Sequence, residues 1–428
     1  MNRLLSSIEK LGLQVEFEYR RANVDQRQLP KIAEAALTKF NQLDGVDLKA
    51  LVSYLEDGSV PQQGHNPFSD LPVTVFRSRD FYIELLVWSH ATTSIHQHGF
   101  SGAFRVVRGS SIHTRYAFRT RRRVSDDCLI GDMNLLGSET LSVGSVRRIE
   151  PGADGLIHSL YHLDNPSLSL IVRTTGHSAF GPQYSYYPPT LALYRKALES
   201  DDLVSTFSRL LLITQSTDRA LFQSLWLDKI SAMEFPRLAW LYLRHYTLLD
   251  NEEQAAFYQR AMTAHGGLVS HLFKAVERYT IKDMLVRLRE QIHDAGLRFF
   301  LALLLNVPDR NDLLTMIARR HPERDPVECC ADWLCQMSVN ETSEFERMKE
   351  IARAMETTGG QKISFSRQLR RALPHKASQK DAREIFTQFV DSGTRTTAEQ
   401  TAERENALSA LAAMPQLASL RYPPDEIK

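Results

Sequence analysis

The stretch TTSIHQHGFSGAFRVVRGS, Thr92 to Ser110, decides how this chain is interpreted. His96 and His98 stand two residues apart, and on a β-strand residues i and i+2 face the same way. Two imidazoles from one strand can therefore reach one metal ion, each at ~2.0–2.1 Å if the metal resembles zinc. The apolar run that follows ends in a turn at Arg108-Gly109. The pattern predicts a metal site on a strand.

A third ligand is expected from the later stretch IEPGADGLIHSLYHLDNPSLSLIVRT, which offers His158 and His162. These two share a face of an extended strand but lie ~13 Å apart along it, so they cannot both bind one ion. His158 follows a glycine turn and is the favoured third ligand. His162 is then expected to be a catalytic group that faces the substrate and transfers protons, although the sequence leaves the choice between the two open.

From Val73 to about Arg173 the residues around these motifs have the composition and spacing that are typical of β-strands. Runs such as FYIELLVW, GAFRVVRG, SIHTRYAF and SLSLIVRT are short, rich in β-branched and aromatic residues, and bounded by turn formers. Many short strands at regular spacing predict a sandwich or a closed barrel. The segment RTRRRVSDDCLIGDMNLLGS, Arg119 to Ser138, interrupts them, and its arginines are interpreted as a solvated loop that could also flank an anionic substrate.

Helical patterns flank this region on both sides. The first 66 residues show apolar residues at three- and four-residue spacings, as in Pro30 to Leu43 and Leu48 to Leu55. From Thr190 onward, LALYRKALE, LVSTFSRLLLIT, RLAWLYLRHYTLL and LRFFLALLLNV carry apolar stripes of helical period. The predicted class is α+β. The expected domains are N-terminal helices over 1–66, the β-barrel over 67–189 and an all-α domain over 190–428, with roughly the last 60 residues looser.

Composition and charge are those of an ordinary globular protein, with 43% hydrophobic residues and a formal net charge of +1. Nothing therefore points to nucleic acid or to an anionic membrane surface. The chain has neither a signal-peptide pattern nor an apolar stretch of the ~18–20 residues that span a bilayer. Three of its four cysteines, Cys329, Cys330 and Cys335, crowd into one predicted helix and suggest buried thiols in a reducing cytoplasm.

The helical half holds one further candidate motif. Glu290 and His293 form an ExxH pair, but a di-iron bundle would need two such pairs and further glutamates. An ordinary exposed or capping pair is therefore expected. The helical domain is expected to pack against the barrel. There it would either cover the mouth of the barrel or form the contact of a homodimer.

Over roughly residues 35–175 the sequence resembles the cysteine dioxygenase branch of the cupins, the thiol dioxygenases. The SIHxH core and the apolar strand that ends in Trp88 carry most of this resemblance. It implies a cupin-type barrel with a ferrous site on His96, His98 and His158. It also implies an arginine, Arg77 in preference to Arg79, that holds the carboxylate of the substrate.

Three departures from that family bear on the substrate. Ser101-Gly102-Ala103 stands where animal members have a cross-linked cysteine, and Arg173 stands where the partner tyrosine is expected. The usual cupin glutamate after the HxH is missing, which favours three histidine ligands. Arg173 is a second candidate for binding an anionic substrate, and His113 and Tyr161 are candidates to line the pocket.

The leading functional prediction is an Fe(II)-dependent cupin oxygenase that acts with dioxygen on a small carboxylate- or thiol-bearing molecule. Zn, Mn or Ni are the alternative metals, and no organic cofactor is expected. One alternative is a ligand-sensing or scaffold protein with a helical partner-binding domain. The other is a non-redox metalloenzyme, either an isomerase or a hydrolase. No nucleic-acid or membrane partner is expected.

Overall fold

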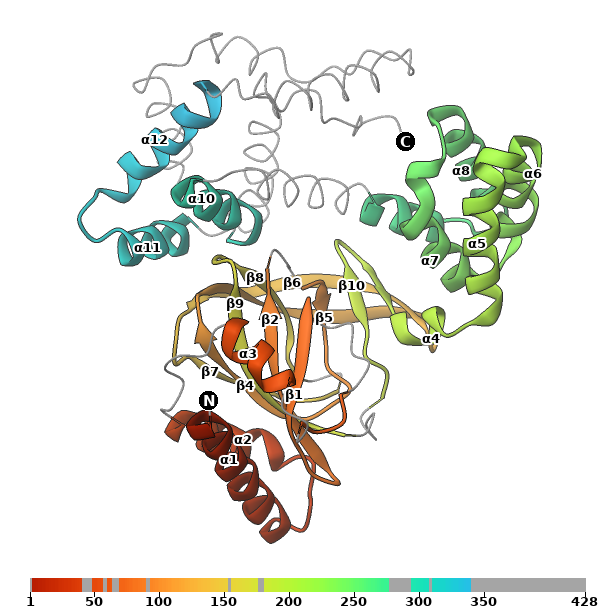
Figure 1. Ribbon diagram of the computed structural model, residues 1–428. Helices are drawn as coiled ribbons and strands as arrows, with labels where there is room; N and C mark the ends of the chain where they lie inside the picture. Colours follow the sequence, from red (N-terminus) through yellow and green to blue (C-terminus); the bar gives the residue numbers. More distant parts are fainter. Residues whose placement is uncertain are drawn as a thin grey trace. The chain divides into compact units, whose positions relative to one another are not determined.

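The chain folds into two compact units, as seen in a computed structural model (Figure 1). The structure describes residues 2–40, 48–56, 60–63, 69–89, 93–152, 155–175, 181–276, 294–307 and 310–339. The first unit contains Met1–Phe207 and Glu234–Trp240, and the second contains the remaining described residues. The fold is mixed α+β, with a β-barrel in the first unit and helices in the second, as the sequence predicts.

Three N-terminal helices pack on one face of the barrel. They are α1 (Asn2–Arg21), α2 (Leu29–Lys39) and α3 (Leu48–Leu55), so the predicted helical start is confirmed for the described residues. Their apolar side chains, among them Val15 and Leu37, form one buried cluster with Ile83 and Leu170 of the underlying sheet. This burial stabilises α2 and α3, which at 11 and 8 residues are too short to be stable alone.

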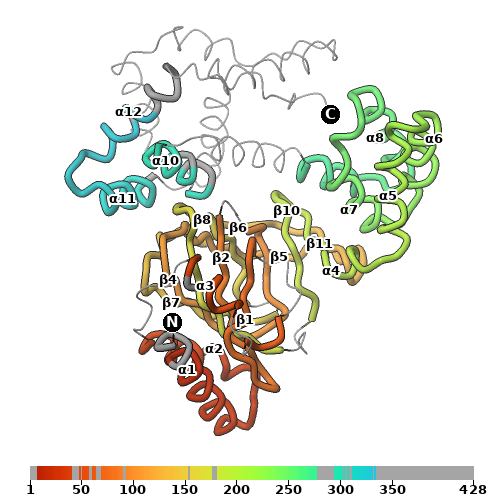
Figure 2. Tube along the Cα trace, in the orientation of Figure 1, coloured from red at the N-terminus to blue at the C-terminus, as the bar shows by residue number. Residues whose placement is uncertain are grey.

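Within the described residues, eleven strands build the barrel in two antiparallel sheets. The first sheet has the order β1-β2-β9-β4-β7, and the second, β10-β11-β6-β5-β8-β3, closes on itself (Figure 2). The strands are β1 (Leu71–Arg77), β2 (Phe81–Trp88), β3 (Ile95–His96), β4 (Gly102–Arg108), β5 (Ser111–Ser125), β6 (Cys128–Leu141), β7 (Val146–Ile149), β8 (Ile157–His162), β9 (Ser167–Thr174), β10 (Ser185–Tyr187) and β11 (Leu191–Leu193).

The core between the two sheets explains the continuous apolar runs of the sequence. Alternate residues of β2, such as Leu86 and Trp88, pack inside the barrel with Phe104 and Leu160. The residues between them contact the N-terminal helices, so both faces of β2 are buried. A strand covered on both faces is apolar throughout rather than alternating.

The loop predicted for Arg119–Ser138 is wrong, because β5 and β6 continue through it as one long hairpin. Its arginines lie on the exposed half of this ribbon, where Arg119 and Arg121 contact Asp132 at 2.8 and 2.6 Å. An exposed two-stranded ribbon needs no apolar face along this part. Its composition therefore resembles that of a solvated loop.

The helical pattern predicted from Thr190 is wrong for its first residues. Leu191–Leu193 is strand β11, fully buried and paired with Leu129 and Ile130 on β6. Helix α4 (Arg195–Glu199) begins only after it. Three successive apolar residues fit a buried strand as well as one turn of helix, so their periodicity could not distinguish the two.

The second unit is helical in its described residues. Trp226, Tyr242 and Phe257 form its aromatic centre, with ring centroids 4.9 to 6.1 Å apart. Cys329 and Cys330 are buried and unbridged, whereas Glu290 and His293 lie outside the described residues. Dimer formation through this unit stays a prediction.

The principal helices after α4 are α5 (Asp202–Thr217), α6 (Arg219–Ser224), α7 (Phe235–His245), α8 (Asn251–His265), α10 (Ala295–Asn306), α11 (Arg310–Arg320) and α12 (Pro326–Val339).

None of the helices among the described residues combines the length and the apolar character needed to cross a bilayer.

Candidate metal centre

Three buried histidines meet inside the barrel. His96 on β3 lies directly opposite His158 on β8 in the strand register, and His98 follows two residues after His96. One ring nitrogen from each of the three lies within 4.8 Å of the other two. Residues opposite each other on neighbouring antiparallel strands project from the same face. The strand pairing therefore completes the set that the HxH spacing begins.

The ring nitrogens are spaced as ligands of one ion would be. The Nε2 atoms of His96 and His98 are 3.2 Å apart. Two nitrogens bound at ~2.0–2.1 Å to one metal, at angles between octahedral and tetrahedral, are separated by about 2.9–3.4 Å. His96 Nδ1 lies 2.8 Å from the carbonyl oxygen of Ser94 and donates to it, so Nε2 keeps its lone pair. This lone pair faces the inside of the cluster.

His158 carries a buried nitrogen that suits the same role. Its Nδ1 is hydrogen bonded to His113, whereas its Nε2 is buried and has no hydrogen-bond partner among the described residues. A buried polar atom without a partner costs about 1–3 kcal/mol. Coordination of a metal removes that cost, so the donor set fits a transition metal that prefers imidazole ligands.

Burial keeps the three imidazoles in the form that binds metals. Desolvation lowers the pKa of His96 to about 4, with a smaller contribution from Arg195 and an opposing one from the Ser94 carbonyl. Burial and the neighbouring histidines also hold the pKa of His98 and that of His158 well below the usual value. All three are therefore neutral at pH 7. Neutral imidazole is the form that coordinates a metal.

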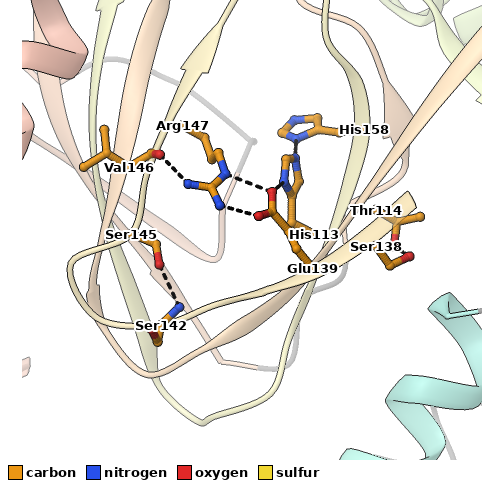
Figure 3. A network of polar contacts seen from close by, with 9 residues as sticks. All are labelled: His113, Thr114, Ser138, Glu139, Ser142, Ser145, Val146, Arg147 and His158. Atoms are coloured by element: carbon orange, nitrogen blue, oxygen red, sulfur yellow. Dashed lines mark hydrogen bonds and ion pairs between the residues drawn. The ribbon is translucent and has the colours of Figure 1, made fainter. Parts of the chain in front are cut away.

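A chain of polar contacts runs outward from His158 (Figure 3). His113 Nε2 lies 2.8 Å from His158 Nδ1, and His113 Nδ1 lies 2.9 Å from Oε1 of Glu139. Arg147 donates to both oxygens of that carboxylate, through Nε at 2.8 Å and through Nη2. His113, expected as a substrate contact, thus has a carboxylate on one ring nitrogen and a predicted metal ligand on the other.

Arg173 is a second candidate substrate residue near the histidines, because its guanidinium contacts Phe100, whose ring lies 4.9 Å from that of His98. Its guanidinium lies 4.0 Å from the ring centre of Phe100 and 5.2 Å from that of Tyr82. Its positive charge contributes to the lowered pKa of His98. Arg173 forms an ion pair with the buried Glu84, with Nη1 3.9 Å from Oε2, and its Nε is buried without a hydrogen-bond partner among the described residues.

The other predicted site residues lie apart from the histidine cluster. Arg77 is exposed at the end of β1 and donates to the Gln62 carbonyl at 3.3 Å. His162 stacks on Trp88 with ring centroids 4.5 Å apart and is hydrogen bonded to Ser167. Tyr161 is fully buried on β8, where its place in the alternation puts it on the opposite strand face from His158.

Gly102 stands at a point where two strands approach closely. A Cβ built on Gly102 would lie 2.0 Å from the carbonyl oxygen of Val172 on β9. A side chain therefore does not fit there without movement of the backbone.

Glu139 and Arg147 are site residues that the sequence analysis missed. Glu139 lies opposite His113 in the β5–β6 register, and Arg147 comes from β7 in the other sheet. Only the pairing of β5 with β6 could have identified Glu139, and half of that hairpin was interpreted as a loop. No local signal marks Arg147.

Comparison with known proteins gives structural likeness only. No protein-family model and no curated protein matches the sequence. Solved structures with a similar fold include hydroquinone 1,2-dioxygenase from Sphingomonas sp. TTNP3, at 13% identity over 26% of this chain and 69% of that one, with a TM-score of 0.21. They also include the DMSP lyase DddQ from Ruegeria pomeroyi DSS-3, at 12% identity over 43% and 98%, with a TM-score of 0.23.

A third such structure is a sugar phosphate isomerase of the cupin superfamily from Silicibacter pomeroyi DSS-3. It is 15% identical over 27% of this chain and 63% of that one, with a TM-score of 0.19. The matched structures carry names of different activities, and two of them are described as cupin proteins. The cysteine dioxygenase branch is not singled out among them.

Proposed function

We propose that the first unit is a metal-dependent cupin enzyme, and that its activity is oxygenation of a small anionic molecule at an Fe(II) ion. His96, His98 and His158 would hold the ion. The observation that carries this proposal is the convergence of three buried ring nitrogens, two of them 3.2 Å apart. A ferrous ion with three protein ligands keeps positions open for substrate and dioxygen, and it would supply the redox chemistry.

The chain's own residues would bind and orient the substrate. Nε of Arg173 makes no hydrogen bond within the described residues, Glu84 lies 3.9 Å from its Nη1, and its charge acts on His98. A guanidinium matches a carboxylate in geometry and charge, which favours a carboxylate-bearing substrate. Phe100 and Tyr82 lie against the guanidinium and limit its movement. Arg173 is therefore preferred to Arg77 as the substrate anchor.

The metal part is tested by metal content. Protein purified without chelator, and chelator-treated protein reloaded anaerobically with ferrous salt, should each contain about one ion per chain by mass spectrometry. His96→Ala and His158→Ala should lose it, because each removes one of three ligands. His162→Gln is the matched control, since it changes a buried histidine of the same strand outside the cluster. Equal occupancy in all four proteins would contradict the site.

The catalytic part is tested by dioxygen consumption. Iron-loaded protein is screened with small carboxylates and with thiols, and Arg173→Met is compared with Arg77→Met. The Arg173 variant should raise KM by about 10- to 100-fold, because a hydrogen bond to a charged group contributes about 1.5–3 kcal/mol. The exposed Arg77 variant should change KM little. Equal effects of the two variants would remove Arg173 from the site.

A non-redox metalloenzyme is the second candidate, because an all-imidazole donor set also suits zinc. In that case the native metal would be zinc or manganese. Iron-loaded protein would then consume no dioxygen with any carboxylate or thiol. A protein without metal in any preparation would favour the ligand-sensing alternative.

A further inference from the structure

We propose that Arg147, Glu139 and His113 form a relay that holds His158 in a single tautomer, with the proton on Nδ1 and the lone pair of Nε2 turned toward the metal. The residues are positioning residues, because none of them belongs to the group of three ligands. The inference rests on the proposed function in that it takes His158 as a metal ligand.

The direction of the hydrogen bonds follows from the outer end of the relay. Arg147 is a donor at every nitrogen, and it contacts both carboxylate oxygens of Glu139. A carboxylate held in this way only accepts, so the hydrogen bond between Glu139 and His113 must be donated by Nδ1 of His113. One proton of the relay is therefore assigned to Nδ1 of His113.

The charges decide what His113 offers at its other nitrogen. Glu139 carries one negative charge, and Arg147 already balances it through two hydrogen bonds. A second positive charge on His113 would have no partner, and its side chain is only 1% exposed. Burying an unbalanced charge is costly, so His113 is neutral and its Nε2 accepts. The 2.8 Å contact is then donated by Nδ1 of His158.

The two sheets of the barrel build this relay together. His113 and Glu139 face each other across β5 and β6, and Arg147 stands on β7, which pairs with β4 in the other sheet. Phe104 on β4 packs beside the rings of His113 and His158, with centroids 6.4 and 6.3 Å away. The relay therefore orients the imidazole of His158 from outside the metal cluster. Outer partners of this kind typically change metal affinity by about 10–100-fold.

The direct test is the tautomer of His158 in metal-free protein. With 15N-labelled histidine, long-range nitrogen–proton NMR correlations distinguish a protonated from an unprotonated ring nitrogen. Wild-type His158 should show Nδ1 protonated and Nε2 unprotonated. In His113→Phe the acceptor is gone, and the population of this tautomer should fall. His113→Gln should restore it, because its carbonyl oxygen can accept from the same nitrogen.

Metal affinity gives the second readout, measured by competition of Zn²⁺ or Co²⁺ with a chelator. His113→Phe and Glu139→Ala should weaken binding about 10- to 100-fold, and His113→Gln should recover most of the loss. Ser138→Ala is the matched control, because Ser138 neighbours Glu139 on β6 but pairs with Thr114 outside the relay (Figure 3). It should bind as the wild type does.

The outcomes separate the relay from the metal site. If wild-type protein takes up no metal, the proposed function fails, whereas the NMR result still judges the relay. If wild type binds metal and His113→Phe leaves both the tautomer and the affinity unchanged, the relay is wrong and the metal site stands. Equal losses in His113→Phe and His113→Gln would also overturn it, because they would show a packing role instead.

Discussion

Acid should destabilise the metal-free barrel through His96, and the size of this effect can be worked out. Burial lowers the pKa of His96 from 6.5 to about 4. Between pH 6.5 and about pH 4 the imidazole of His96 is protonated in the unfolded chain and unprotonated in the folded chain. Stability therefore falls as the pH falls, starting near pH 6.5, and the loss is complete below pH 4.

The magnitude follows from proton linkage. At pH 5 the unfolded imidazole is almost fully protonated and native His96 is about one-tenth protonated, which gives a loss of about 2 kcal/mol relative to pH 8. Below pH 4 the loss from this residue approaches about 3 kcal/mol, at about 1.4 kcal/mol for each pKa unit. The lowered pKa of His98 and that of His158 act in the same direction.

The assay must report on the barrel alone. Trp88 lies in the first unit and Trp226 in the second, so whole-chain fluorescence mixes two unfolding events. Amide exchange of peptides from β8 and β9, followed by mass spectrometry after chelator treatment and corrected for intrinsic rates, reports on the barrel. Wild type is compared with His96→Gln, which cannot take up the proton.

Wild type should lose about 2 kcal/mol more than His96→Gln between pH 8 and pH 5. Equal losses in the two proteins would refute the reasoning. A wild-type loss of less than about 0.5 kcal/mol would also refute it, because such a small loss means that His96 has an ordinary pKa in the folded chain.

Three further predictions follow from the same structure. Binding of Zn²⁺ at pH 6 should release almost no protons, whereas three histidines of ordinary pKa would release about 2.3; calorimetry in buffers of different ionisation enthalpy decides between them. Gly102→Ala should destabilise the barrel by about 1–3 kcal/mol in the exchange assay, since its Cβ would lie 2.0 Å from the Val172 carbonyl oxygen, and an unchanged barrel stability would contradict this close approach. Burial raises the pKa of the Cys128 thiol to about 12, so alkylation of native protein at pH 8 should leave Cys128 unlabelled in a peptide map until urea unfolds the barrel.

Local patterns were sufficient for much of the fold and for the centre of the site. The short runs of β-branched and aromatic residues in FYIELLVW and SLSLIVRT predicted β2 and β9. The HxH spacing together with the turn before His158 predicted three histidines that the structure brings together. Each of these signals lies within a few residues of sequence. Strand periodicity fixes the face on which a side chain lies, and a turn fixes where a strand starts.

The sequence by itself therefore determined the α+β class and the pair His96 and His98, and it favoured His158 over His162 as the third histidine. The tertiary structure decided the rest: the long β5–β6 hairpin, the ion pair of Arg173 with Glu84 and the exposure of Arg77, the stacking of His162 on Trp88, and the contacts of Glu139 with Arg147 and His113. The physical reason is register. Which faces meet depends on how strands far apart in sequence pair, and that pairing is set by burial over the whole barrel rather than by any local pattern.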